Sequence, residues 1–488
     1  MRTEPVMHPG QAPASPAVLA ADELLLVPDQ VLLRDGPRRD LAVVVANGRF
    51  REVGLAEALV AGNPHLEPIR LPDTLLMPGF IDAHHHLSQA FGKAIAFGEP
   101  SEIFRRIWVP LERSLDAELV YLAAKLAALE SLRGGFTTVV DAGTRAEEHT
   151  DAIAEATRAV GLRCVLGQLC NDLGDGADPV RIRRRAEVHL VRWQGDELIR
   201  PSLAISIPEA ASDAMLQGIS ALCAEAGALF QTHANEHLVA VERSLVQCGL
   251  RPIEHLHRVG ALGPQVLLAH ATLVTPAELA MLRDTGTAVA YNPVATQWKG
   301  NAAAPAEMMA ALGIRFGIGT DATRADAFRL IDAAEATQRL AFGLASGDSS
   351  CGGGWLWLDH ATAAGAEAIG LGGITGEIAP GKAADFLLLD LAVPEMTPSW
   401  DLTWELVRFA SRAQVAAVFT AGRLRLWQAW PVDWDGHALM RSVAERVAAA
   451  VASAPIQRVH PRADEHRARV QQRTASPVLA ALATGSAP

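Results

Sequence analysis

The chain has few cysteines, and none of them forms a closely spaced pair. The five cysteines are Cys164, Cys170, Cys223, Cys248 and Cys351. They are scattered over 488 residues without a C-x-x-C motif. A disulfide framework would need an even set at regular spacings in an oxidising compartment. We therefore expect no disulfide bonds and a protein of the reducing cytosol.

Long apolar runs and an excess of positive charge are also missing. Hydrophobic residues make up 50% of the chain, yet no run reaches the roughly eighteen residues of a membrane span, so none is expected. The first twenty residues contain Glu4 and four prolines where a secretory signal needs an uninterrupted apolar segment, so no signal is expected. The formal net charge of −12 argues against a nucleic-acid groove and favours neutral or cationic small substrates.

What the sequence does contain is a regular alternation of apolar runs and helical stretches. Its 488 residues exceed the usual size of one core, so a barrel with an accessory domain is expected. The apolar runs are 75–84, 136–143, 161–169, 200–207, 228–235, 266–274, 287–294 and 314–321. Ala/Leu-rich helices such as 116–133 and 275–285 lie between them. Eight β/α units in series predict an α/β protein with a (β/α)8 TIM barrel.

Two β-rich flanks bracket the predicted barrel. Residues 23–72 and 376–433 alternate apolar and polar side chains and contain turn signals such as Asn47-Gly48. They predict one small β-sandwich domain built from both termini. The predicted boundaries are 15–74 and 373–440 for the two parts of the sandwich, 75–372 for the barrel, and 441–488 for a helix and tail. The tail, 456–488, is interpreted as a solvated or oligomer-contacting appendage.

A histidine pair stands at the end of the first apolar run, in PGFIDAHHHLSQ. Residues i and i+2 of a strand share a face, so His84 and His86 can aim at one point while His85 faces away. Surface histidine pairs are common, and the pair alone is weak evidence. Other polar residues lie at or near the ends of later runs: Asp141, His233, His270, Asn292 and Asp321. Because the C-terminal strand ends of a barrel meet at its catalytic face, a shared site explains them better than unrelated core or loop roles.

Four of these residues form a donor set of three nitrogens and one oxygen: His84, His86, His233 and Asp321. Zn²⁺ accepts such ligands, keeps an open position for water, and lowers the pKa of that water to about 7. The run 200–207 contains no lysine that would bridge a second metal. One Zn²⁺ per chain is therefore predicted, with Fe²⁺ as the alternative metal.

Proton transfer is assigned to residues beside these ligands. Glu236 follows His233 by three residues, where the strand turns into a predicted helix at 237–247. A carboxylate there could move a proton from water to a ring nitrogen or leaving amine. The alternative is a first-turn glutamate favoured by the helix dipole. His270 is interpreted as orienting the water or polarising the substrate, with metal ligation as the alternative, and Asp321 as both ligand and proton acceptor.

Two other zinc motifs are alternatives to a barrel site. Residues 233–237, HANEH, match the H-x-x-E-H motif of inverted metalloproteases. That motif needs a single helix, whereas ALFQT immediately upstream is typical of a strand, and it leaves Asp321 and the H-x-H pair without a role. The P-C-x-x-C signature of the other zinc deaminase fold is absent from the sequence. The barrel interpretation is preferred.

Taken together, the motifs resemble those of the amidohydrolase superfamily, in particular its mononuclear aminohydrolase branch of guanine, 8-oxoguanine, isoxanthopterin and cytosine deaminases and s-triazine hydrolases. The resemblance rests on PGFIDAHHHL, H-x-x-E, LLAHATL, Asn292-Pro293 and GIGTD, and it spans about residues 25–430, including GEIAPGKAADFLLLD. It implies that His84, His86, His233 and Asp321 bind Zn²⁺, that Glu236 shuttles protons and that His270 activates water. SIPEAASD and DATRADAFR depart from the family's usual substrate-side loops, so the substrate stays open.

Two residues are candidates for substrate contacts. Gln89 completes HHHLSQ, which resembles purine and pterin deaminases, where the glutamine amide reads the amide edge of the ring. The alternative is a role supporting the metal ligands or facing solvent. Trp298, beside Lys299 in the loop after the seventh run, offers a stacking surface, with simple packing as the alternative.

The predicted function is hydrolytic removal of an amino group from a nitrogen heteroaromatic such as a purine or pterin. One alternative is a hydroxy-s-triazine alkylaminohydrolase or chlorohydrolase. An alternative of another class is an inactive metal-binding homologue that acts in assembly. A homodimer or higher homo-oligomer is expected, without a nucleic-acid or membrane partner.

Overall fold

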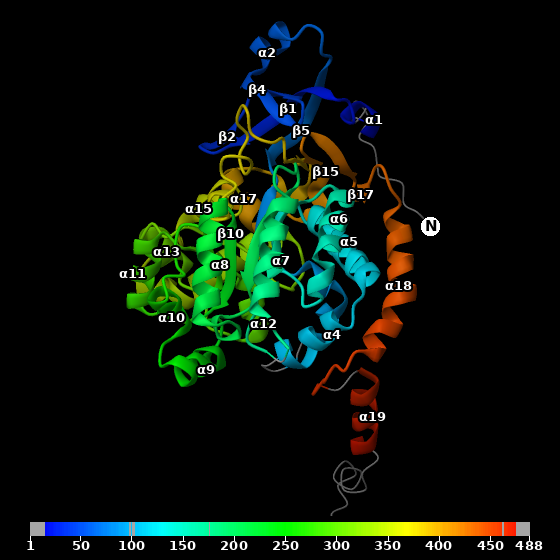
Figure 1. Cartoon of the computed structure of the whole chain (residues 1–488). Coiled ribbons are helices and arrows are strands. Elements are labelled where there is room, and N and C mark those ends of the chain that lie inside the picture. Colours follow the sequence, from blue (N-terminus) through cyan, green and yellow to red (C-terminus); the bar gives the residue numbers. More distant parts are fainter. Residues whose placement is uncertain (1–14, 97–98, 100–102, 175, 461–462, 475–488) are drawn as a thin grey trace, which may run out of the picture.

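A computed structural model describes residues 15–474 except 97–98, 100–102, 175 and 461–462, and it shows two sheets (Figure 1). Eight parallel strands, paired in sequence order, form the barrel. They are β6 (Phe80–His85), β7 (Phe136–Asp141), β8 (Arg163–Leu169), β9 (Ile199–Ile205), β10 (Leu229–Ala234), β11 (Val266–His270), β12 (Ala288–Tyr291) and β13 (Phe316–Ile318). A parallel bridge between His85 and Asp321 joins the last unit to the first. The predicted barrel is confirmed.

The first predicted run is divided between the two sheets. Residues 75–78 belong to β5 (Pro68–Pro78), which pairs with β14 (Phe386–Asp390) outside the barrel. Gly79 lies at the break, where a Cβ would come within 2.1 Å of the Thr137 side chain. The predicted barrel start at residue 75 is therefore wrong, because an apolar run does not reveal where the chain leaves one sheet for another.

Helices follow the strands of the barrel. They are α5 (Ala117–Arg133), α6 (Thr150–Val160), α7 (Pro179–Arg192), α8 (Asp213–Ala226), α9 (Leu238–Cys248), α10 (Pro252–Arg258), α11 (Pro276–Thr285), α12 (Pro293–Lys299), α13 (Ala306–Ala311), α14 (Ala327–Ser346), α15 (Gly353–His360) and α16 (Ala363–Ala368). Thr275 caps α11: its hydroxyl accepts from the N–H of Glu278, whose carboxylate accepts from the N–H of Thr275. Small and branched side chains such as Ile81 and Val140 fill the inside of the ring.

The second sheet takes its nine strands from both ends of the chain. Its order is β17 (Trp430–Pro431), β16 (Arg423–Trp427), β15 (Val415–Thr420), β14, β5, β1 (Glu23–Leu33), β3 (Leu41–Ala46) and β4 (Arg49–Leu55), and β2 (Gly36–Arg38) pairs with β1. The sheet curls back on itself. As a result, Phe50 on edge strand β4 packs against Phe386 of β14, with ring centroids 5.8 Å apart. The predicted sandwich is thus one continuous curled sheet around its own core. Alternation of apolar residues identifies a buried face but not the number of sheets.

The C-terminal helix returns to the barrel. α18 (Gly436–Ser453) runs beside α5, and α19 (Ala463–Thr474) extends away below the barrel (Figure 1). The remaining short elements are α1 (Pro16–Leu19), α2 (Ala56–Gly62), η1 (Leu87–Gly92), α3 (Lys93–Ala96), η2 (Phe104–Trp108), α4 (Val109–Arg113), η3 (Glu147–His149), η4 (Pro208–Ala210), η5 (Pro394–Met396), α17 (Leu402–Arg408) and η6 (Arg412–Gln414).

The tail is not wholly an appendage. The N–H of Gln457 donates to the carbonyl of Arg106 at 2.9 Å. The N–H groups of Val459 and His460 donate to the carboxylate of Glu99 at 2.9 and 3.1 Å. Residues 457–460 are exposed, as in a solvated tail, but their backbone is tied to Arg106 and Glu99, a contact that composition does not disclose. Residues 461–462 and 475–488 lie outside the described part of the chain.

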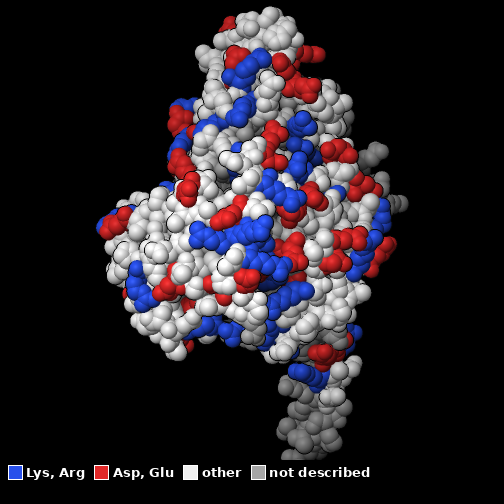
Figure 2. Space-filling model, viewed as in Figure 1, with Lys and Arg blue, Asp and Glu red and all other residues white. Residues whose placement is uncertain are grey.

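Charges of both signs are interspersed on the face seen in Figure 2. Arginines of α7 form a basic run there, and Arg181, Arg185 and Arg192 each contact an acidic side chain. Among the described residues, no helix combines the length and apolar character required to cross a bilayer.

Candidate active site

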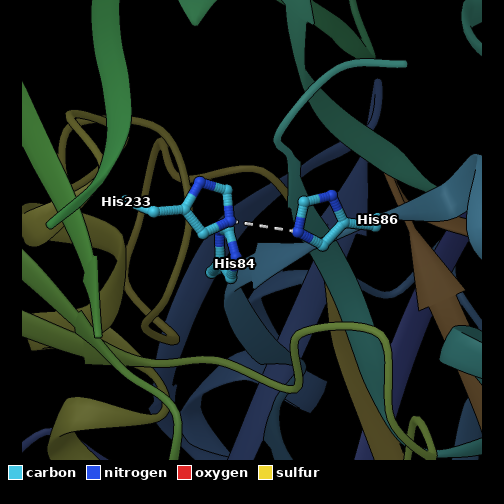
Figure 3. A group of neighbouring side chains, drawn as sticks. All are labelled: His84, His86 and His233. Carbon is cyan, nitrogen blue, oxygen red and sulfur yellow. Dashed lines mark hydrogen bonds between the residues drawn. The ribbon is translucent and has the colours of Figure 1, made fainter. Parts of the chain in front are cut away.

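Three histidines meet at the C-terminal mouth of the barrel (Figure 3). β6 carries His84 and leads into His86, and β10 carries His233. The Nε2 atoms of His86 and His233 are 3.2 Å apart, and ligand atoms of all three residues lie within 4.8 Å of one another. Two nitrogens bound tetrahedrally to one Zn²⁺ at about 2.0–2.1 Å would be about 3.4 Å apart. The histidines therefore fit a divalent metal ion.

His85 faces away from this point, as predicted. A register shift in the pairing of β6 with β7 lies between Asp82 and His85 and redirects the strand end. The Nδ1 atom of His85 is 2.6 Å from the hydroxyl of Thr320. The carboxylate of Asp82 accepts from the N–H of Thr320 at 2.9 Å and from that of His84 at 3.3 Å. These bonds fasten the first strand to the residues after the last strand. They lie directly beneath the metal-ready histidines, His84, His86 and His233.

Asp321 approaches the histidines from the end of β13. Its φ of +56° is rare for a residue other than glycine, and its N–H donates to the carbonyl of His84 at 2.8 Å. Its Oδ1 lies 3.4 Å from Nε2 of His86 and 3.9 Å from Nε2 of His84. Its Oδ2 lies 3.8 Å from Nε2 of His270. A strained backbone thus turns Oδ1 of Asp321 towards His84 and His86, and Oδ2 towards His270.

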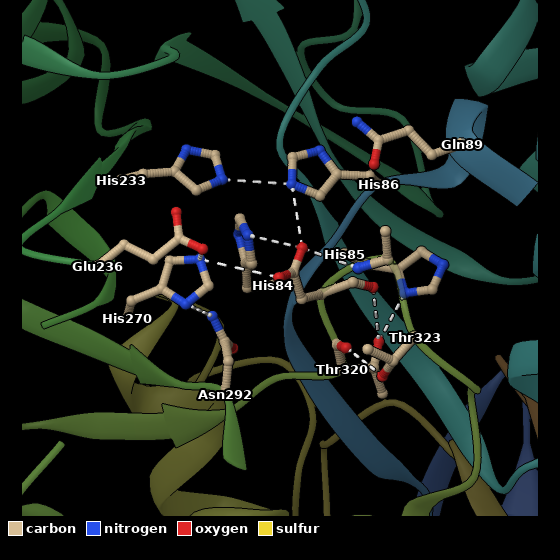
Figure 4. Close-up of polar contacts among 12 residues, drawn as sticks. His84, His85, His86, Gln89, His233, Glu236, His270, Asn292, Thr320 and Thr323 are labelled. Atoms are coloured by element: carbon tan, nitrogen blue, oxygen red, sulfur yellow. Dashed lines mark hydrogen bonds and ion pairs between the residues drawn. The ribbon is translucent and has the colours of Figure 1, made fainter. Parts of the chain in front are cut away.

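Glu236 and His270 complete this group (Figure 4). Nε2 of His270 is 3.8 Å from Oε1 of Glu236, and Nδ1 of His270 is 3.2 Å from the side-chain amide nitrogen of Asn292. The φ of His270 is +76°, a second left-handed residue at the mouth. The structure therefore brings together all the strand-end residues predicted for the metal and for proton transfer.

Lys299 is the neighbour that sequence reasoning did not place in this centre. Its Nζ is 2.6 Å from Oε1 of Glu236 and 2.8 Å from Oδ2 of Asp321. The preceding residue, Trp298, packs against the apolar cluster that contains Ile107 and does not belong to the described residues lining the cavity. The sequence does show a lysine shortly after Asn292-Pro293. However, the rotation of α12 about its axis decides whether residue 298 or residue 299 points into the centre.

Burial and charge set the protonation states. Burial first, and neighbouring histidines next, lower the pKa values of His84 and His86, and the same causes lower the pKa of His233 to about 4. Burial alone would raise the pKa of Asp321, but Lys299 and His270 outweigh it and hold that pKa well below its ordinary value. For Glu236, burial is likewise outweighed by His270 and Lys299, and the pKa is lowered. Neutral imidazoles beside ionised carboxylates are the forms that bind metals.

An open cavity lies above the centre. Its lining includes Gln89, Phe104, Arg145, Glu209 and Arg243 in addition to the metal-ready residues.

Gln89 lies in η1 (Leu87–Gly92), immediately after the histidines, and is 2% exposed. Its Nε2 donates to Oε2 of Glu112 in α4 (Val109–Arg113) at 3.5 Å. Arg145 donates to the same oxygen at 3.2 Å and to the hydroxyl of Ser206 at 3.3 Å. The structure thus brings Gln89 to the cavity. Arg145, in the segment after β7, was missed because no local pattern marks it.

The inverted-protease interpretation of HANEH is wrong. His233 belongs to β10, Asn235 has a φ of +51°, and His237 caps the start of α9 by accepting from the N–H of Ala240 at 3.1 Å. The motif therefore spans a strand, a turn and a helix start, whereas the protease site requires one helix.

An eight-stranded barrel with histidines and an aspartate at its C-terminal mouth is a framework for metal-dependent hydrolysis. The pattern of the amidohydrolase family matches residues 75–425, and the chain belongs to this family. It is a hydrolase acting on carbon–nitrogen bonds other than peptide bonds.

Known proteins resemble the chain over most of its length. A 5-methylthioadenosine/S-adenosylhomocysteine deaminase from Syntrophobacter fumaroxidans is 30% identical over 412 residues, covering 82% of this chain and 92% of that protein. A 5'-deoxyadenosine deaminase from Methanothermobacter thermautotrophicus is 27% identical, covering 83% and 93%.

Solved structures share the fold. An adenosine deaminase from Xanthomonas campestris with bound zinc has a TM-score of 0.80 at 26% identity, covering 88% of this chain and 98% of that one. An atrazine chlorohydrolase from Arthrobacter aurescens complexed with zinc has a TM-score of 0.77 at 21% identity, covering 88% and 100%. The second likeness concerns the fold alone.

Proposed function

We propose that this protein is a zinc-dependent hydrolytic deaminase that removes the exocyclic amino group of an aminopurine, with a nucleoside-type purine as the preferred substrate. The observation that carries the proposal is the convergence of His84, His86, His233, Asp321 and Glu236 at one end of the cavity. Relatives named as deaminases of adenine nucleosides support the substrate class.

His84, His86, His233 and Asp321 would hold one Zn²⁺, with Fe²⁺ as the alternative metal. Bound zinc lowers the pKa of a water to about 7 and so supplies hydroxide at neutral pH. Asp321 would bind through Oδ1, the oxygen that faces His84 and His86. The nucleophile would therefore be generated at the closed end of the cavity.

Hydrogen bonds assign different roles to His233 and His270. The Nδ1 of His233 is 2.7 Å from the carbonyl of Ser206, which only accepts, so the proton sits on Nδ1 and Nε2 keeps a lone pair for the metal. The Nδ1 of His270 instead faces the Asn292 amide, a donor, so its proton sits on Nε2. His270 would therefore donate from Nε2 to water or substrate and would not bind the metal.

Glu236 would move protons. Its ionised carboxylate would take a proton from the attacking water and give it to the ring nitrogen next to the amino-bearing carbon. A C–O bond forms in this step. A second proton passed to the amino nitrogen lets the C–N bond break, so that ammonia leaves and the ring keeps a carbonyl group. Asp321 would help to accept the proton of the water.

A second candidate is a lactam ring such as guanine or a pterin, and Gln89 is the observation that favours it. Its amide lies buried beside the metal-ready histidines, where it could pair with a ring N–H and C=O. The triazine alternative has only a shared fold in its favour. The complete ligand set together with Glu236 speaks against an inactive homologue acting in assembly.

The proposal also includes a setting for the enzyme. The five cysteines are unpaired, which supports a reducing compartment such as the cytosol. We propose a homodimer or higher homo-oligomer, which sedimentation of the purified protein would test.

A substrate panel tests the function. Ammonia release by zinc-loaded protein would be measured with adenosine, 5'-deoxyadenosine, 5'-methylthioadenosine and S-adenosylhomocysteine, then with guanine, 8-oxoguanine, isoxanthopterin, cytosine and amino-triazines. We expect kcat/KM to be at least about tenfold higher for one of the nucleosides. If guanine or a pterin is the best substrate, the lactam candidate would replace the nucleoside proposal. If a triazine is the best substrate, the triazine alternative would be favoured. No turnover by fully loaded protein would favour the inactive homologue.

A further inference from the structure

A buried lysine lies between the two carboxylates of the centre. The Nζ of Lys299 contacts Oε1 of Glu236 at 2.6 Å and Oδ2 of Asp321 at 2.8 Å. The side chains of Lys299, Glu236 and Asp321 are only 17%, 16% and 6% exposed. Water screens such contacts poorly, so they are stronger than ion pairs at the surface. Lys299 is therefore a component of the centre.

The lysine does not obstruct the metal ligands. Asp321 turns Oδ1 towards the histidine pair and gives Oδ2 to Lys299. A metal bound through Oδ1 would not require the ammonium to leave Oδ2. Lys299 can therefore keep both carboxylate contacts in the metal-loaded protein.

Glu236 depends on Lys299 for its orientation. It lies in the segment between β10 and α9, outside any regular element. Among the described residues, the ammonium of Lys299 is the donor found within hydrogen-bonding distance of its carboxylate. The nearby Nε2 of His270, at 3.8 Å, is too far for such a bond. Holding Oε1 in this way leaves Oε2 for proton transfer.

We propose that Lys299 is a positioning residue that joins Glu236 to Asp321 and fixes the proton-shuttling carboxylate beside the metal ligands. Because its ammonium shares Asp321 with the metal and has the same sign of charge, it also opposes metal binding. The catalytic part of this inference rests on the proposed function, whereas the effect on metal affinity does not.

Two substitutions separate these effects. Lys299→Met removes the charge and keeps the length of the side chain, and Lys299→Arg keeps the charge. Gln297→Met is the matched control on the same helix, because its side chain donates to Thr337 at 2.8 Å in an exposed position. Zinc affinity would be measured by competition with a chromophoric chelator, and kcat and KM on the best substrate of the panel.

We expect Lys299→Met to bind one zinc per chain at least about threefold more tightly than the wild type. Its kcat should fall at least about tenfold, while KM stays within about threefold. Lys299→Arg should recover part of the loss in kcat, and Gln297→Met should match the wild type in all three quantities.

Zinc binding by Lys299→Met that is unchanged or weaker would overturn the proposal, and so would an unchanged kcat. An equal loss of kcat in Lys299→Arg and Lys299→Met would overturn the part assigned to the charge. If the wild type deaminates nothing in the panel, the proposed function fails by itself. The zinc titration of Lys299→Met would still support or overturn the role of the lysine at the metal.

Discussion

The floor of the active site and its outer wall are held by different kinds of contact. The floor consists of His84, His86, His233, His270 and Asp321, which barrel strands carry or lead into directly. The outer wall consists of the described residues 87–96, 99 and 103–111, against which the returning tail, 454–460, packs. Backbone bonds such as that from Asp321 N–H to the His84 carbonyl fix the floor. Substitutions in the floor should therefore abolish the chemistry, whereas those in the wall should change substrate binding more gradually.

Glu99 shows how the wall is assembled. Its fully buried carboxylate accepts from Arg106 at 3.0 Å, from Arg458 at 3.3 Å, and from the N–H groups of Val459 and His460. Ile456 packs nearby on the cluster that contains Ile107. A wall held by a tail more than 350 positions away in sequence is a long-range assembly.

The largest expected effect is in the floor. Asp321→Asn removes the charge of a metal ligand and should reduce activity by at least about 10³-fold with loss of bound zinc, because metal affinity depends on deprotonated ligands. Zinc content by atomic absorption and turnover on the panel would measure this. His237→Asn is the control and should keep about one zinc per chain. Zinc retained by Asp321→Asn and lost by His237→Asn would contradict the assigned ligand set.

The next effect concerns Glu236, beside the floor, and separates chemistry from metal binding. Glu236→Gln keeps the size of the side chain and removes the titratable group, so kcat should fall by about 10²–10⁴. Zinc content should stay at that of the wild type, since Glu236 is not among the assigned ligands. Steady-state kinetics with a parallel zinc assay would test this. Full activity of Glu236→Gln would mean that Glu236 only stabilises the start of the following helix.

The floor could be predicted from sequence because each of its residues ends a short apolar run, and strand period and barrel topology then fix where the side chain points. His84 and His270 follow this logic. Lys299 does not, because the rotation of α12 about its axis decides whether residue 298 or 299 enters the centre. The break at Gly79 was hidden inside an apolar run, and the contacts of Glu99 join segments whose pairing no local pattern encodes.

Gln89 stands where floor and wall meet, and its replacement should affect specificity more than chemistry. If the substrate pairs with its amide, Gln89→Leu leaves a buried ring edge unpaired, at a cost of about 1–3 kcal/mol per lost partner. We then expect kcat/KM to fall about tenfold or more with unchanged zinc content. The effect should be larger for guanine-like or pterin-like rings than for adenine nucleosides. Equal kcat/KM for wild type and variant on every ring would remove Gln89 from the substrate contacts.

The smallest effect should come from the outer wall. Glu99→Gln removes the charge that receives the tail, so KM should rise about threefold while kcat and zinc content stay unchanged. Glu118→Gln is the control, because Glu118 also contacts the C-terminal helix, through Arg446, but is 63% exposed. A rise in KM shared by both variants would assign it to a general effect of charge.

The pH dependence of stability provides a second measure of the same contact. Burial alone would raise the pKa of Glu99, but the N–H of Val459 and the guanidinium of Arg106 outweigh it and lower the pKa to about 2. A carboxyl whose pKa is depressed by folding stabilises the protein above its unfolded pKa, here the ordinary value of 4.5, and loses that contribution as the pH falls towards 2. Glu99→Gln should therefore lower Tm by about 2–5 °C at pH 7, and the gap should shrink below about pH 4.5. Thermal unfolding of both proteins from pH 7 to pH 3 would show this. A gap that is absent at pH 7, or that stays constant down to pH 3, would mean that the ionised carboxylate does not hold the tail on the wall.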